Sequence, residues 1–201
     1  GNSITRHGPK PDIGWSGNCA MAASSEDKDF VHLVIRGLTP KGGPAPETLV
    51  KNIAAFERGY ATHDAANQLE DAAAFNPDLI ILAIGENAAA PDDAASKAQF
   101  SQAVVKLLHA ITANRKPTIV VRSCFWANPA KDEALKNACQ EVGGTFVHIG
   151  ALAKDEANYA RAERSFEHQG VAAHPGDKGM RAIADAILDA ISHPQQRKGA
   201  P

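Results

Sequence analysis

Four short apolar runs rich in branched side chains punctuate the chain, at residues 31–35, 79–84, 118–121 and 145–149. Continuous apolar runs of this length are typical of strands that are buried on both faces, and such strands usually belong to parallel sheets. The pattern therefore predicts four strands of a parallel sheet.

Alanine-rich segments separate these runs, and their apolar residues recur at steps of three and four. The clearest are residues 97–113 and 129–142, and a further segment of this kind begins near Asp177. This spacing is typical of amphipathic helices that cross from one strand to the next. The alternation predicts an α/β fold, a three-layer α/β/α sandwich with a parallel, flavodoxin-like sheet.

Length and charge narrow the class of protein. The 201 residues fit one domain, expected over 1–193, with a disordered tail at 194–201. The 21 Lys and Arg face 23 Asp and Glu, and no basic stripe is present, which argues against a nucleic-acid partner. The longest apolar run is far shorter than the roughly 20 residues that span a bilayer, so we expect no membrane span.

Residue types that bind metals or cofactors show no organised spacing. The three cysteines, Cys19, Cys124 and Cys139, are interpreted as small buried hydrophobes. The histidines lack metal-ligand spacing, and no glycine loop suited to phosphate is present. We predict no metal and no cofactor. A flavodoxin-like nucleotide-binding module would need a phosphate-binding glycine loop, so the sequence argues against this class of protein.

Three separated stretches are candidates for chemistry: Gly1–Thr5 (Gly-Asn-Ser-Ile-Thr), Ile84–Asn87 (Ile-Gly-Glu-Asn) and Ala173–Pro175 (Ala-His-Pro). Taken singly, they are more often a helix cap, a plain turn and a loop. In a βαβ fold, however, functional groups gather at the carboxyl ends of strands and beside helix starts. Ser3 is expected at the start of a helix, Asn87 after a strand and His174 before the last helix.

Together these stretches resemble the SGNH (GDSL-like) hydrolase superfamily over nearly the whole chain. The superfamily has a Gly-Asp-Ser turn, an internal Gly, a Gly-x-Asn after a strand and a C-terminal His. The segments Gly14–Asn18 and Ala173–Met180 resemble a bacterial branch of it. The resemblance implies the SGNH hydrolase fold and a carboxylic ester hydrolase that works through an acyl-serine intermediate.

The resemblance also implies a role for each matching residue. Ser3 is the nucleophile and His174 the general base that takes its proton. The oxyanion hole consists of the Ser3 backbone N–H, the Asn87 amide and a backbone N–H after the second strand. Gly59 fits that third position best, and Thr62 is the fallback.

The chain departs from the superfamily in the acid of the triad. An Asp usually stands three residues before the histidine, and Val171 occupies that position here. Three alternatives remain for orienting His174: a backbone carbonyl, a displaced acid such as Glu167, or nothing at all. A Ser–His dyad is the working hypothesis, and Asp177 is interpreted as a helix N-cap. Asn2 and Ala88, which replace the usual acids at their positions, are interpreted as branch differences.

A second departure lies at the start of the chain. The strand that normally precedes the nucleophile is absent before Gly1, so either the sequence is a shortened form of a longer protein or another segment fills the gap, and we expect the former. No signal segment is visible, so the compartment stays open; a secreted or periplasmic location is favoured if such a segment was removed. The oligomeric state also stays open.

The expected substrate is a small acyl ester, above all an acetyl ester on a carbohydrate. The acyl preference follows from the resemblance, and Trp15 and Trp126 are candidate contacts for a sugar ring, although packing roles are the commoner use of such residues. The alternative is a degenerate, non-catalytic member that binds a glycan or a protein through the same pocket. Reaction with a serine-directed phosphonate separates the two.

Overall fold

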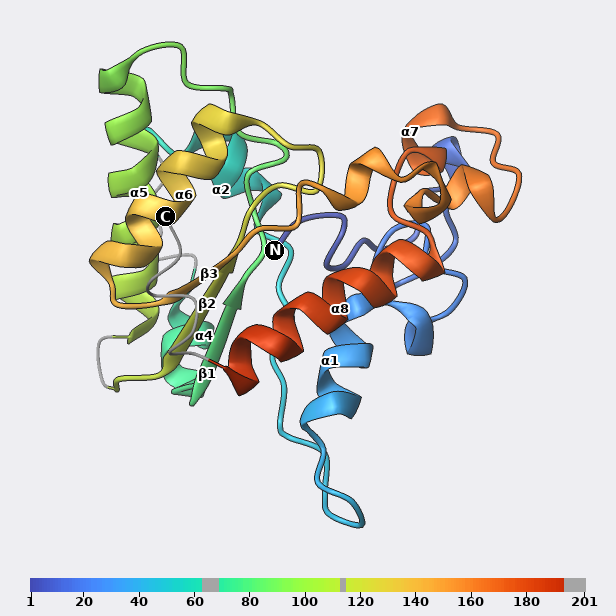
Figure 1. Cartoon of the computed structure of the whole chain (residues 1–201), viewed down its shortest axis with the longest axis horizontal. Helices are drawn as coiled ribbons and strands as arrows, with labels where there is room; N and C mark the ends of the chain where they lie inside the picture. The colour runs from blue at the N-terminus through green and yellow to red at the C-terminus, as the bar shows by residue number, and fades with distance from the viewer. Residues whose placement is uncertain (63–68, 113–114, 194–201) are drawn as a thin grey trace.

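The computed structural model describes residues 1–62, 69–112 and 115–193. The expected tail at 194–201 lies outside this part of the chain. Within it, the protein is an α/β structure with a parallel sheet and helices on both of its faces (Figure 1). The predicted fold class is therefore confirmed at the level of an α/β protein.

In the part of the chain that the structure describes, the sheet contains three parallel strands in the order β1-β2-β3. They are β1 (Leu79–Leu82), β2 (Thr118–Arg122) and β3 (Thr145–Val147). Val120 lies at the centre, in register with Ile81 on one side and Thr145 on the other. Three of the four predicted strands are confirmed, although the first and last of these end two residues earlier than predicted.

The fourth predicted strand, at 31–35, is wrong, because these residues form helix α1 (Phe30–Leu38). The Asp29 side chain caps this helix by accepting a hydrogen bond of 2.8 Å from the backbone N–H of His32. Phe30, Leu33 and Val34 are buried at helical spacing, and α1 packs against α8 (Asp177–Ser192). The apolar run is thus one face of a capped helix.

The predicted crossover helices are confirmed as α5 (Ala94–Thr112) and α6 (Pro129–Glu141). Asn128 caps α6, with its side chain accepting from the backbone N–H of Lys131. Within the described residues, the remaining α-helices are α2 (Ala54–Gly59), α4 (Glu70–Phe75) and α7 (Gln169–Ala172). Short 3₁₀ helices lie at Pro11–Ile13, Glu26–Lys28, Leu152–Lys154, Glu156–Asn158 and Ala160–Ala162.

Two apolar clusters lie on opposite sides of the sheet. On one side, Val120 and Val147 pack with buried residues of α1 and α8. On the other, Ile80 and Val121 pack with buried residues of α5 and α6. Figure 1 shows α1 and α8 apart from α5 and α6, with the strands between them. Burial on both faces explains why the strands carry continuous apolar runs.

The contacts of Gly1 show that the first candidate stretch, residues 1–5, begins at the carboxyl end of the sheet. Its amino group donates to the carbonyl oxygen of Lys51 at 2.9 Å, and its own carbonyl accepts from the N–H of Ile53 at 2.6 Å. A Cβ at Gly1 would lie 3.0 Å from the carbonyl oxygen of Ala83, which follows β1. Residues 1–5 therefore begin between the segment 51–53 and the end of β1.

Candidate active site

The nucleophile candidate Ser3 lies in a turn, and the prediction that it begins a helix is wrong. Asn2 builds this turn: its backbone carbonyl accepts from the N–H groups of Thr5 and Arg6, and its side-chain oxygen accepts from the N–H of Ile4 at 3.0 Å. Ser3 is half-buried, and its carbonyl accepts from the N–H of Met21. The turn therefore holds the Ser3 backbone while its side chain stays partly accessible.

Ser3 and His174 meet across 171 positions of sequence. The hydroxyl Oγ of Ser3 lies 2.9 Å from Nε2 of His174. The other ring nitrogen, Nδ1, lies 2.6 Å from the carbonyl oxygen of Gly170. A carbonyl oxygen can only accept, so Nδ1 carries the proton and the neutral ring presents an unprotonated Nε2 to the serine hydroxyl. This tautomer is the one that a general base requires.

The environment of His174 favours the neutral ring. Burial lowers the pKa of His174, and the hydrogen bond to Gly170 opposes that shift without cancelling it. The histidine belongs to the segment between α7 and α8, and its ring meets that of Trp126 edge to face, with centroids 5.4 Å apart. His174 is therefore ready to accept a proton near neutral pH.

Among the three alternatives for orienting His174, the structure places a backbone carbonyl at Nδ1. Val171 is buried in the apolar cluster beneath α8. Glu167 is exposed, and within the described residues no hydrogen bond joins it to His174. The carbonyl of Gly170 comes into range because residues 169–172 form the short helix α7 just before the histidine.

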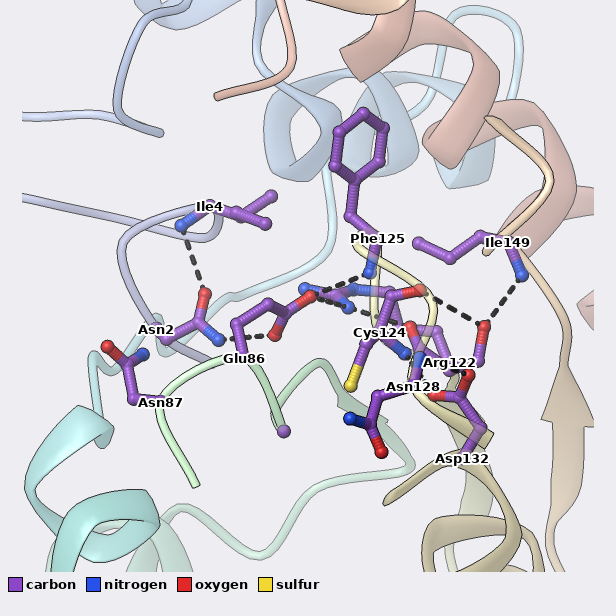
Figure 2. Close-up of polar contacts among 12 residues, drawn as sticks. Asn2, Ile4, Glu86, Asn87, Arg122, Cys124, Phe125, Asn128, Asp132 and Ile149 are labelled. Carbon is purple, nitrogen blue, oxygen red and sulfur yellow. Dashed lines mark hydrogen bonds and ion pairs between the residues drawn. The ribbon is translucent and has the colours of Figure 1, made fainter. Parts of the chain in front are cut away.

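Behind the nucleophile turn lies a buried charged network that the sequence analysis missed (Figure 2). Glu86 accepts from the Asn2 side-chain amide at 2.6 Å, from Nη1 of Arg122 at 2.6 Å and from the N–H of Phe125 at 2.9 Å. Burial would raise the pKa of Glu86, but the Arg122 guanidinium and these hydrogen bonds outweigh it and lower the pKa. Glu86 therefore ties the turn at Asn2 to the end of β2.

Asn87 follows β1 in a turn that requires glycine. Gly85 has a φ of +119°, and a Cβ there would lie 2.7 Å from Sγ of Cys124. The carboxylate of Glu57 organises this turn: its Oε2 accepts from the backbone N–H of Gly85 at 3.1 Å and of Asn87 at 2.7 Å. Burial raises the pKa of Glu57. Neither Glu57 nor Arg58, which also contacts Asn87, was identified from the sequence.

Gly59 is not in a position that requires glycine. It ends α2, and a Cβ built there would meet no atom within 4 Å, so the close approach that motivated its choice is absent from the described residues. The fallback, Thr62, donates its backbone N–H to the carbonyl of Gly59 at 3.0 Å. A third oxyanion donor from this region remains a prediction.

The two tryptophans differ in their surroundings. Trp15 is only 8% exposed and belongs to the apolar cluster on the α1 and α8 side, with its indole N–H donating to the carbonyl of His7 at 3.0 Å. Trp126 is half-buried and contacts the ring of His174. Of the two, Trp126 therefore lies beside the candidate catalytic pair.

Asp177 has a different role from the predicted N-cap. Gly176 is the N-cap of α8, and the carboxylate of Glu163 accepts from the N–H groups of Asp177 and Lys178, both at 2.8 Å. The Asp177 side chain instead accepts from the backbone N–H and hydroxyl of Ser24. Asp177 therefore ties the start of α8 to the segment before α1.

No family model, curated protein or solved structure matches this chain. In the part of the chain that the structure describes, no three His, Cys, Asp or Glu side chains form a group that could hold a metal ion. None of the helices within that part is both long enough and apolar enough to cross a membrane.

Proposed function

We propose that this protein is a serine esterase that hydrolyses small acyl esters through an acyl-serine intermediate on Ser3. The observation that carries the proposal is the contact of 2.9 Å between Ser3 Oγ and His174 Nε2, with Nδ1 of the same ring held by the Gly170 carbonyl. A serine hydroxyl is a weak nucleophile until a neighbouring base can take its proton. This arrangement supplies such a base in the required tautomer.

In the first half of the reaction, Ser3 Oγ attacks the ester carbonyl carbon while its proton moves to Nε2 of His174. The imidazolium keeps its Nδ1–H on the carbonyl of Gly170. The tetrahedral intermediate then collapses, the C–O bond to the alcohol breaks, and Nε2 returns the proton to the departing oxygen. A water molecule then gives a proton to Nε2 and attacks the acyl carbon, the bond between that carbon and Ser3 Oγ breaks, and Nε2 returns the proton to Oγ as the acid leaves.

Negative charge on the carbonyl oxygen needs donors already in place. We assign this role to the Asn87 amide and to the backbone N–H of Ser3. An Nδ2 group carries two protons, and the Asn87 Nδ2 gives one to Glu57 at 3.3 Å. Its second N–H is then available to the oxyanion.

The proposed substrate is an acetyl ester on a carbohydrate or a similar polar alcohol. The acyl preference rests on the resemblance to the SGNH hydrolases. Support for a sugar comes from Trp126, because a half-buried ring beside His174 offers a face or edge on which a sugar ring can pack. On the same resemblance, we propose that the chain belongs to the SGNH hydrolase superfamily and has its fold.

The test compares hydrolysis of p-nitrophenyl acetate by the wild type, Ser3→Ala and Ser192→Ala, with intact-mass detection of a phosphonate adduct. Ser192 ends α8, which places it about 22 Å along the helix from its start beside His174. We expect Ser3→Ala to lose both activity and adduct and Ser192→Ala to keep both. Absence of both from folded wild-type protein would favour the alternative, a non-catalytic member that binds a glycan or protein.

A further inference from the structure

Two adjacent residues of α2, Glu57 and Arg58, form hydrogen bonds with the side-chain amide of Asn87. Oε2 of Glu57 accepts from Nδ2 of Asn87 at 3.3 Å, and the Arg58 guanidinium donates to Oδ1 of Asn87 at 3.3 Å. The same Oε2 also accepts from the backbone N–H of Asn87. Both the backbone and the side chain of Asn87 are therefore tied to the end of α2.

These two partners have opposite hydrogen-bonding character, which determines how the amide is oriented. A carboxylate at neutral pH accepts only, and a guanidinium donates only. An amide rotated by 180° would present its oxygen to Glu57 and its NH₂ to Arg58, so both hydrogen bonds would be lost. Only one of the two amide orientations satisfies Glu57 and Arg58 together.

We propose that Glu57 and Arg58 are positioning residues that fix the Asn87 amide with its NH₂ directed to the oxyanion. This inference rests on the proposed function, because it needs Asn87 to donate to the reacting carbonyl oxygen. Asn87 directly follows Glu86, and Glu86 accepts from the side-chain amide of Asn2, the residue that precedes the nucleophile (Figure 2). Because the amide is already oriented, no reorganisation of the donor is needed when negative charge develops on the carbonyl oxygen.

Glu57 and Arg58 differ in exposure, which makes them separable by experiment. Glu57 is fully buried, whereas Arg58 is exposed. Glu57→Gln keeps the shape of the side chain but replaces one carboxylate oxygen by an NH₂ group. Arg58→Met keeps most of the alkyl chain and removes every donor. Because Arg58→Met disturbs only an exposed side chain, it remains informative even if Glu57→Gln fails to fold.

The experiment is a pair of double-mutant cycles with Asn87→Ala, read as kcat and KM for p-nitrophenyl acetate. Loss of a whole oxyanion donor typically lowers kcat by about 100-fold or more. We therefore expect kcat to fall roughly 10-fold in Glu57→Gln and roughly 3-fold in Arg58→Met, with smaller changes in KM. In the Asn87→Ala background each further loss should shrink to less than about 2-fold, because residues that act through one group are not additive.

Two control variants match the chemistry of the changes. Asp132→Asn alters another buried carboxylate that accepts two backbone N–H groups, those of Cys124 and Asn128, after β2. Arg181→Met removes an exposed guanidinium of α8 that pairs with Asp185. Both should leave kcat within about 2-fold of the wild type, in each background.

The outcomes distinguish the inference from the proposed function. If Asn87→Ala lowers kcat but the losses multiply in the double variants, Glu57 and Arg58 do not act through Asn87, and this inference is overturned while the esterase stands. Unchanged kcat in Asn87→Ala would remove Asn87 from the oxyanion hole, and the inference with it. A folded wild type with no hydrolysis and no phosphonate adduct overturns both.

Discussion

The carbonyl oxygen of Gly170 lies 2.6 Å from Nδ1 of His174, in the place where a triad carboxylate would lie. A neutral carbonyl fixes the tautomer and the plane of the ring as an acid would. It carries no charge, however, and hydrogen bonds to ionised acceptors are roughly twice as strong as neutral ones. The geometry of a general base is therefore present with weaker stabilisation of the imidazolium.

Restoring an acid at the position of the missing one should not restore a triad. Val171 is 1% exposed and packs in the apolar cluster, so an Asp there would bury a carboxylate among apolar side chains. We expect Val171→Asp to lower the free energy of unfolding by about 3 kcal/mol or more and to leave kcat no higher than the wild type. Urea unfolding and p-nitrophenyl acetate hydrolysis measure the two effects.

The matched control is Val171→Ala, which shortens the same side chain without introducing charge and should cost roughly 1–3 kcal/mol. A rise in kcat for Val171→Asp would contradict the assignment of Gly170 as the partner of His174, because it would mean that the new carboxylate reaches Nδ1.

The pH dependence of the reaction should reflect the buried histidine. His174 acts as a base only when Nε2 is unprotonated, so kcat/KM falls as the pH drops through its pKa. Burial lowers the pKa of His174 from the ordinary value of 6.5, which moves the acid limb of the profile below that pH. At pH 6.5 more than half of the histidine is then unprotonated, so we expect kcat/KM to exceed half of its plateau value at this pH.

Burial raises the pKa of Glu57, which lies in the same site, so the histidine has to be titrated directly to separate the two groups. Following the His174 ring protons by NMR in Ser3→Ala, where no reaction occurs, gives the pKa of the histidine alone. A midpoint at or above 6.5 would show that burial does not dominate at this site.

Hydrophobic patterning predicted the sheet well and failed at one run. Residues 79–84, 118–121 and 145–149 are continuous apolar runs because their strands are covered on both faces. The run at 31–35 looks alike, since five apolar-rich residues are compatible with a strand or a buried helix. The cap from Asp29 and the packing of α1 on α8 decide for the helix.

For the candidate site, the order of the motifs predicted that Ser3 and His174 lie together, but it did not identify the residues that surround them. Ser3 and His174 were predicted as partners, and they are in contact. Glu86 and Arg122 pair across 36 positions, and a charged residue is ordinarily expected at the surface. The only signal was an arginine at the end of an apolar strand. The choice of Gly170 for His174 depends on the path of α7, which no local pattern specifies.

The buried pair of Glu86 and Arg122 should be costly to break from one side. Arg122 is fully buried, and its Nη1 lies 2.6 Å from the Glu86 carboxylate. We expect Arg122→Met to lower the free energy of unfolding by about 3–5 kcal/mol, because it leaves a buried carboxylate without its counter-charge. Chemical denaturation of the variant checks this value.

Adding Glu86→Gln to Arg122→Met should recover part of that loss, since it removes the stranded charge. The side-chain oxygen of the glutamine can still accept from the Asn2 amide, so the nucleophile turn keeps this hydrogen bond. If the double variant is as unstable as the sum of the two single variants, the pair is not coupled in the way its geometry indicates.

The two tryptophans should separate substrate binding from packing. Trp15 is enclosed in the core, so Trp15→Ala should lower the free energy of unfolding by about 3–5 kcal/mol. Trp126 is half-buried beside His174, so Trp126→Ala should cost less stability and raise KM, more for an acetylated sugar than for p-nitrophenyl acetate. The ratio of kcat/KM between the two esters removes any general effect on His174. An unchanged ratio would assign Trp126 to packing and withdraw the support that it gives to a carbohydrate substrate.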